Sequence, residues 1–105
     1  MTTGSDVIAI GSDQPIHWNG LKQNGVVQTN ATVTGQLKTE SGSTLSTFSL
    51  TLSDETTGLY VGTIPDNITS GLTDCETYIV ELTATVGQFT EFRRLERIAI
   101  YRGEI

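Results

Sequence analysis

The sequence contains one cysteine and one histidine, and these two scarcities exclude several kinds of chemistry. With Cys75 alone, the chain has no internal disulfide and no cysteine cluster to hold zinc. Asp74 and Glu76 flank Cys75 and would raise its pKa by like-charge repulsion, which disfavours a nucleophilic role. A catalytic triad or a Cys–His pair would depend on His17, which we expect instead to be a surface or edge residue that packs on Trp18.

Basic residues are also scarce, with six Lys and Arg against 12 Asp and Glu, for a formal net charge of −6. This balance repels phosphate, so it argues against binding to nucleic acid or to anionic lipid. Four of the six basic residues crowd the C-terminal end, at Arg93, Arg94, Arg97 and Arg102. That asymmetry fits either head-to-tail contact between copies of the chain or a solvated face of a strand.

Long apolar runs are absent, so the sequence predicts no membrane-spanning segment. The N-terminus lacks a basic start and an apolar core, so no signal peptide is visible, and we expect a soluble protein made in the cytoplasm. No phosphate-binding loop is present. The carboxylates in predicted turns follow no calcium-loop pattern, so we expect no cofactor and no metal; they are Asp54, Glu55, Asp66, Asp74 and Glu76.

What the sequence does contain is Thr, with 18 residues, and a period-2 alternation typical of strands. The segment 78–86 places Tyr78, Val80, Leu82, Ala84 and Val86 on one predicted core face, and Ile79 on the mostly polar face. The segments 31–38 and 45–53 alternate in the same way, the latter with Phe48, Leu50 and Leu52 on its apolar face. The length of 105 residues suits one domain, residues 1–105.

The connections support the same class. Polar turns are expected at 38–43 and 53–58, a turn of 3₁₀ helix within 65–74, and a tight hairpin at Gly87 and Gln88. In the last strand, 89–101, the alternation slips, which predicts a bulge near Arg94 or Leu95. Residues 6–11 and 15–20 suggest two short, less regular strands, and residues 1–12 suggest an arm that is flexible when free and ordered when bound.

The stretch GLYVGTIP, residues 58–65, carries a resemblance to a known fold. Asp54, Gly58 and Tyr60 resemble the corner of immunoglobulin-like domains, in which a tyrosine hydroxyl ties the start of a strand to the turn backbone. With Gly62, the spacing of Gly and Tyr is similar to that of many bacterial and phage immunoglobulin-like modules. Together with the strand pattern, this predicts an all-β protein, an antiparallel immunoglobulin-like β-sandwich of about seven strands.

The short format and the GLYVGTIP region resemble the small immunoglobulin-like proteins of tailed-phage particles, of the capsid-decoration or head–tail neck type. The resemblance implies a non-enzymatic protein located in the virion, which binds other copies of itself or virion proteins. Contacts are expected in the N-terminal stretch 1–20 and the strand 89–102. The candidate interface residues are Trp18, Phe92, Arg93, Arg94, Arg97, Tyr101 and Arg102.

Two alternatives stay open. Exposed aromatic residues on a sandwich can stack on sugars, so the chain could be a carbohydrate- or cell-surface-binding module of a larger protein. The aromatic candidates for such a platform are Trp18, Phe89, Phe92 and Tyr101. An enzyme is the third reading, and no pair of carboxylates stands out to support it.

Overall fold

A computed structural model describes residues 7–101 of the chain. Within this range the chain forms nine strands and one short helix, so the all-β prediction is confirmed. They are β1 (Val7–Ile10), β2 (Gln14–Trp18), β3 (Lys22–Gln23), β4 (Val26–Val27), β5 (Thr32–Thr39), β6 (Thr44–Asp54), β7 (Leu59–Ile64), α1 (Asp66–Thr69), β8 (Thr77–Val86) and β9 (Phe89–Tyr101). No helix in residues 7–101 has the length and apolar character needed to cross a membrane.

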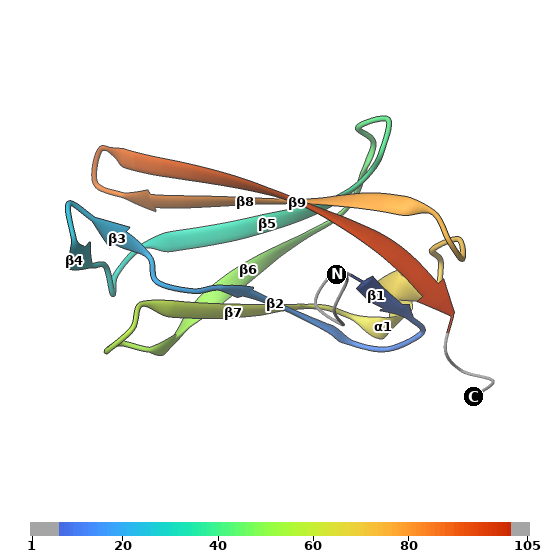
Figure 1. Cartoon of the computed structure of the whole chain (residues 1–105), viewed down its shortest axis with the longest axis horizontal. Coiled ribbons are helices and arrows are strands. Elements are labelled where there is room, and N and C mark those ends of the chain that lie inside the picture. The colour runs from blue at the N-terminus through green and yellow to red at the C-terminus, as the bar shows by residue number, and fades with distance from the viewer. Residues whose placement is uncertain (1–6, 102–105) are drawn as a thin grey trace.

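Seven of the strands form one sheet in the order β1-β9-β8-β5-β6-β7-β2, and β3 pairs with β4 in a separate hairpin. Figure 1 shows β5, β8 and β9 in one layer and β2 and β7 in another, with β6 passing between them. The short connection 11–13 carries the chain from β1 at one edge of the sheet to β2 at the other. The sheet therefore curls into a nearly closed, barrel-like shape.

The sheet is mixed, and in this respect the expectation of a purely antiparallel fold is wrong. Strand β1 runs parallel to β9, with Val7 opposite Ile98 and Ile10 opposite Tyr101. The other pairs of the large sheet are antiparallel. The first described strand, β1, lies at the β9 edge, and the chain then crosses to the β7 edge instead of continuing into a hairpin.

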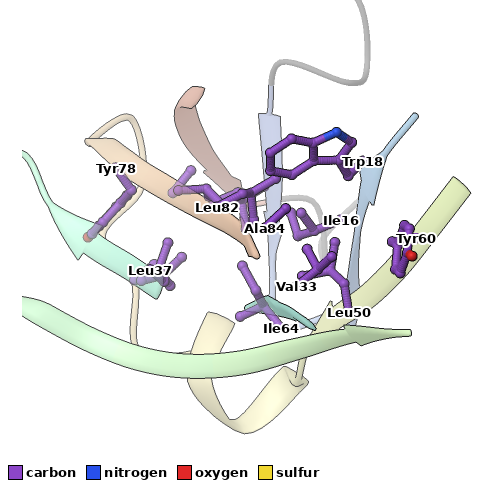
Figure 2. Close-up of a cluster of buried hydrophobic side chains, with 14 of the residues drawn as sticks. Ile16, Trp18, Val33, Leu37, Leu50, Tyr60, Ile64, Tyr78, Leu82 and Ala84 are labelled. Carbon is purple, nitrogen blue, oxygen red and sulfur yellow. The ribbon is translucent and has the colours of Figure 1, made fainter. Parts of the chain in front are cut away.

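The core lies between the two layers, and its centre comes from β5 and β8, which have strand partners on both sides. The predicted core face of β8 is confirmed for Tyr78, Val80, Leu82 and Ala84, which are buried, and Val86 is half-buried. Figure 2 shows the side chains of this cluster converging from β2, β5, β6, β7 and β8; those labelled are Ile16, Trp18, Val33, Leu37, Leu50, Tyr60, Ile64, Tyr78, Leu82 and Ala84.

Two apolar side chains differ from the predicted pattern. Ile79, expected on the polar face of β8, is buried, because its cross-strand neighbours Lys38 and Glu96 have long side chains that cover apolar surface. Leu52, expected in the core, is 37% exposed, and the β6–β7 register shifts directly after it, between Leu52 and Asp54. Alternation predicts the face of a side chain, and the depth of burial depends on its neighbours.

The N-terminal arm predicted for residues 1–12 is not seen from residue 7 onward. Ile8 and Ile10 of β1 are buried in the core. The hydroxyl of Thr69, itself buried, donates to the carbonyl of Ser12 at 2.7 Å and accepts from the N–H of Gly11 at 3.2 Å. Residues 7–12 are therefore fixed by strand pairing, burial and hydrogen bonds, and residues 1–6 lie outside the described range.

The bulge predicted near Arg94 or Leu95 is also absent. The register of β8 with β9 runs without interruption from Thr77 opposite Ile98 to Val86 opposite Phe89. The tight hairpin at Gly87 and Gln88 is confirmed, and Gly87 takes the left-handed φ of 58° that such turns favour. Because the alternation never slips, charged residues of β9 lie on the face that turns toward the core.

Candidate functional site: the open edge of β9

One edge of β9 is open over most of its length. Strand β9 pairs with β8 from Phe89 to Ile98 but with β1 only from Ile98 to Tyr101. Within the described residues, 89–97 therefore have a strand partner on one side only. Both the N–H and the C=O of Ala99 bond toward the β8 side, to Glu76 and Cys75. Because strand backbone groups alternate in direction, residues 90, 92, 94 and 96 direct theirs to the open edge.

The inner face of β9 carries charge next to Trp18. The carboxylate of Glu91 lies 3.8 Å from the guanidinium of Arg93, and both side chains are half-buried. The Arg93 guanidinium lies 4.1 Å from the centroid of the Trp18 ring, a distance at which a cation is attracted to the ring face.

This position corrects the assignment of Trp18 as an interface residue. The Trp18 side chain is 0% exposed and belongs to the core cluster, where Figure 2 shows it beside Ala84 and Ile16. It is buried because it alternates with Ile16 on the inner face of β2. Its Nε1 has no hydrogen-bond partner among the described residues.

The outer face of β9 is the more accessible one. Phe92 is 56% exposed and Ile98 is 43% exposed. Between them, Arg94 and Glu96 form an exposed ion pair with a nitrogen–oxygen distance of 3.3 Å. Exposed apolar and charged side chains beside an open strand edge are typical of an interaction surface.

A groove of about 340 Å³ separates β9 from β2, the strand that ends the other side of the sheet. Its lining residues are Gln14, Pro15, Ile16, His17, Asn19, Leu95 and Arg97. Strand β2 also has a partner on one side only among the described residues, but Pro15 removes a backbone donor from it. The side chain of Gln14 donates to the carbonyl of Pro15 at 3.3 Å. These features obstruct further strand pairing at β2, whereas β9 contains no proline and keeps all its backbone donors.

The remaining predicted interface residues lie at the C-terminal end of β9. Arg97 lines the groove and donates to the carbonyl of Glu96 at 3.0 Å, and no carboxylate among the described residues forms an ion pair with it. The backbone of Tyr101 pairs with Ile10. The side chain of Tyr101 and the whole of Arg102 lie outside what the structure describes. The structure thus places Phe92, Arg93, Arg94 and Arg97 on one strand.

The Tyr60 hydroxyl links two parts of the chain, but it bonds to Gln28 and Ala31 instead of to the expected 53–58 turn. It donates to the carbonyl of Gln28 at 2.9 Å and accepts from the N–H of Ala31 at 3.1 Å. It therefore fixes the loop that leads into β5. The 53–58 turn is held by its own bonds: the Asp54 carboxylate accepts from the N–H of Thr56 at 2.9 Å, and the Gly58 N–H donates to the Asp54 carbonyl at 2.9 Å.

The two glycines around Tyr60 are required by close backbone approach. Gly58 has a φ of +74°, and a Cβ there would lie 2.9 Å from the carbonyl oxygen of Leu21. A Cβ on Gly62 would lie 2.6 Å from the carbonyl oxygen of Ser49. Real Cβ atoms do not approach this closely, so both positions exclude a side chain. GLYVGTIP is thus a scaffold segment.

The groups considered for catalysis are dispersed. His17 is exposed, on the groove side of β2. Cys75 is exposed and has a φ of +68°, and the charge of the neighbouring Asp74 raises the pKa of its thiol, as the sequence predicts. Within residues 7–101, no three His, Cys, Asp or Glu side chains come together in a way that would hold a metal ion.

Sequence reasoning missed the role of Glu91 and Leu95. The sequence gives Glu91 no role and predicts a bulge at Arg94 or Leu95, yet Glu91 and Leu95 lie on the inner face of β9, beside Arg93 and Arg97. No local signal marks the inner face of β9, because apolar and charged residues occur on both of its faces.

The whole sequence was also compared with known proteins. No protein-family model matches the chain, and a search of curated proteins found no match.

Proposed function

We propose that this chain is a non-enzymatic structural protein that acts through protein–protein contacts, as a component of a virus particle of the capsid-decoration or head–tail neck type. The observation that carries the proposal is the open edge of β9, with exposed Phe92 beside it. An exposed strand edge with charged residues nearby is a surface to which another protein chain can add.

The finer fold assignment belongs to the same proposal. We infer that the two layers are those of an immunoglobulin-like β-sandwich that has curled toward a barrel. The two packed layers and the pairing of β1 with β9 support this inference. Assembly of such a particle would take place in the host cytoplasm, and the partners would be copies of the chain or other virion proteins.

The sugar-binding alternative is weakened by the burial of Trp18. A sugar-stacking platform needs an accessible aromatic face, and the ring of Trp18 is enclosed by the core and covered by Arg93. Phe92 alone retains a widely exposed ring among the described residues. A single exposed phenylalanine beside an arginine fits a protein contact at least as well as it fits a sugar.

The test of the proposal is association with particles. A lysate from the natural source of the gene would be fractionated by density-gradient sedimentation, and the chain quantified by mass spectrometry in each fraction. We expect it to sediment with large particles at a fixed ratio to their major shell protein. Recovery only at the top of the gradient, with no particle containing it, would contradict the proposal.

A matched variant makes the experiment specific. Phe92→Lys alters the exposed side chain beside the open edge, and Val26→Lys alters an equally exposed apolar residue on β4. We expect the first to reduce the particle-bound fraction at least about tenfold and the second to leave it unchanged. Equal loss in both variants would contradict the assignment of the surface.

A further inference from the structure

We propose that β9 is a self-complementary edge, at which two copies of the chain pair antiparallel about a two-fold axis through Phe92. The inference deepens the proposed function, because it rests on contacts between copies and names the strand and register of that contact. It starts from the backbone. Residues 90, 92 and 94 direct their N–H and C=O groups to the open edge, so an antiparallel strand can bond to them.

On the inner face, charged side chains then lie opposite the opposite charge in the second copy, and apolar side chains lie opposite apolar ones. With the axis at Phe92, Glu91 lies opposite Arg93 of the second copy, and Phe89 lies opposite Leu95 of the second copy. The Glu91–Arg93 pair is of the type without mutual backbone bonds, in which side chains come closest. Since Glu91 and Arg93 already lie 3.8 Å apart within one strand, the dimer completes a square of alternating charges.

Side chains on the outer face pair equally well. Phe92 lies opposite its own copy, and directly opposed residues have Cβ atoms about 4.5–5.5 Å apart, close enough for the rings to touch. Phe92 is 56% exposed in the single chain, so this contact buries apolar surface that water otherwise covers. Thr90 lies opposite Arg94 of the second copy, a pair without charge conflict.

Other registers of the same edge are unfavourable. An axis at Glu91, Arg93 or Arg94 would place that charged residue opposite itself, and like charges directly opposite destabilise a sheet. An axis at Leu95 would place Arg93 opposite Arg97. It would also extend the pairing to Ile98, where β1 already occupies the edge. Among two-fold axes from Glu91 to Leu95, only the axis at Phe92 avoids placing like charges opposite each other.

The surroundings of the strand allow a second strand to approach. Figure 1 shows the β8–β9 hairpin reaching the end of the molecule, with β9 outermost in its layer. The side chains of Glu91 and Arg93 are 37% and 38% exposed, so they are accessible from the edge. The contact is isologous, and it closes after two copies, so it forms a dimer and not a fibre.

The first experiment is sedimentation velocity on the purified full chain over a concentration series. We expect a monomer–dimer equilibrium in which Glu91→Arg or Arg93→Glu raises the dissociation constant at least about tenfold. The double variant E91R/R93E inverts the square of charges, so we expect it to restore dimerisation to within about threefold. Circular dichroism establishes that each variant is folded.

Matched controls change the same charges elsewhere. Glu40→Arg and Lys22→Glu alter exposed residues away from β9, and we expect both to dimerise like the unaltered chain. Phe92→Lys gives a second route to disruption that does not touch the core, with the same tenfold loss expected. A dimer that survives Phe92→Lys and Glu91→Arg, or a double variant without rescue, would overturn the proposal.

Hydrogen exchange distinguishes pairing between two copies from coverage of the β9 edge by other residues of the same chain. We expect the amides of Thr90, Phe92 and Arg94 to exchange rapidly in dilute protein and slowly at concentrations where the dimer forms. Slow exchange in the monomer would overturn the proposal, since it would mean that the chain's own residues cover the edge. If the protein stays monomeric yet sediments with particles, the dimer proposal is contradicted and the proposed function is not. If it dimerises but is found in no particle, the proposed function is contradicted and the dimer proposal is not.

Discussion

Strands β8 and β9 belong to one hairpin and lie in unbroken register, yet their inner faces are opposite in character. The inner face of β8 carries Val80, Leu82 and Ala84, all buried. The inner face of β9 carries Glu91 and Arg93 directly opposite Ala84 and Leu82. Since both strands face the same core, strand pairing alone does not decide how apolar a strand must be.

The difference follows from the edges of the two strands. Strand β8 has partners on both sides, β5 and β9, so a charge on its inner face would have no route to water. A long side chain on β9 can pack its stem inward and keep its charged end at the open edge. Charges there also discourage unspecific pairing of the edge. We therefore expect β8 to contribute most to stability and β9 to provide a contact surface, and three substitutions test that division: Leu82→Ala, Arg93→Met and Glu96→Gln.

The largest effect is expected for Leu82→Ala in β8. Leu82 is 0% exposed, and truncation of a buried leucine to alanine costs about 2–5 kcal/mol in the free energy of unfolding. Urea denaturation followed by circular dichroism would measure the loss. Leu95→Ala is the matched control on β9, where the side chain is only half-buried, and we expect a smaller cost. Equal costs would contradict the division between the two strands.

The next largest loss of stability is expected where a tyrosine hydroxyl holds the chain near the end of a strand. Tyr60→Phe leaves the Gln28 carbonyl and the Ala31 N–H without their partner, which we expect to cost about 1–3 kcal/mol. Tyr78→Phe at the start of β8 is the comparison, since its hydroxyl accepts one bond, from the Thr73 N–H at 2.9 Å. Denaturant midpoints should fall further for Tyr60→Phe, and the reverse order would contradict the prediction.

The sequence predicts the burial pattern of β8 well and that of β9 poorly, because β8 is a central strand and β9 has an open edge. In β8 every second residue is apolar and the strand is central, so pattern and burial agree on the inner face, and Ile79 is the exception on the outer face. In β9, Arg94 and Glu96 share a face with the apolar residues Phe92 and Ile98, which predicts a bulge that the unbroken register with β8 excludes. Whether a strand is central or at an edge depends on topology, and topology is not visible in a local pattern.

The same limit explains Trp18 and Tyr60. Trp18 follows Ile16 at a spacing of two, which in retrospect marks a core face, but the short segment gave no independent sign that it is covered. The acceptor of the Tyr60 hydroxyl lies 32 residues earlier in the chain, at Gln28. The groove between β2 and β9 is of the same kind, since neither strand's sequence indicates that the two lie together.

A smaller effect is expected where β9 touches the core through charge. Arg93→Met retains most of the side-chain stem but removes the cation from the Trp18 ring, a contact of about 0.5–1 kcal/mol at a partly exposed site. Thermal and urea unfolding of this variant would be compared with Arg94→Met on the outer face, where we expect no such loss. A loss as large as that of Leu82→Ala would show that β9 carries stability after all.

The smallest effect is expected on the outer face of β9. Glu96→Gln breaks the ion pair with Arg94, whose side chains are 51% exposed for Arg94 and 67% exposed for Glu96. Exposed pairs of this kind contribute about 0–1 kcal/mol, so the urea midpoint should barely move. Lys38→Gln is a sharper contrast, because Lys38 and Glu81 pair at 2.8 Å and are only 23% and 22% exposed. If Glu96→Gln lowered the free energy of unfolding more than Lys38→Gln, the outer charges of β9 would be needed for stability. A smaller loss leaves them free to contact a partner.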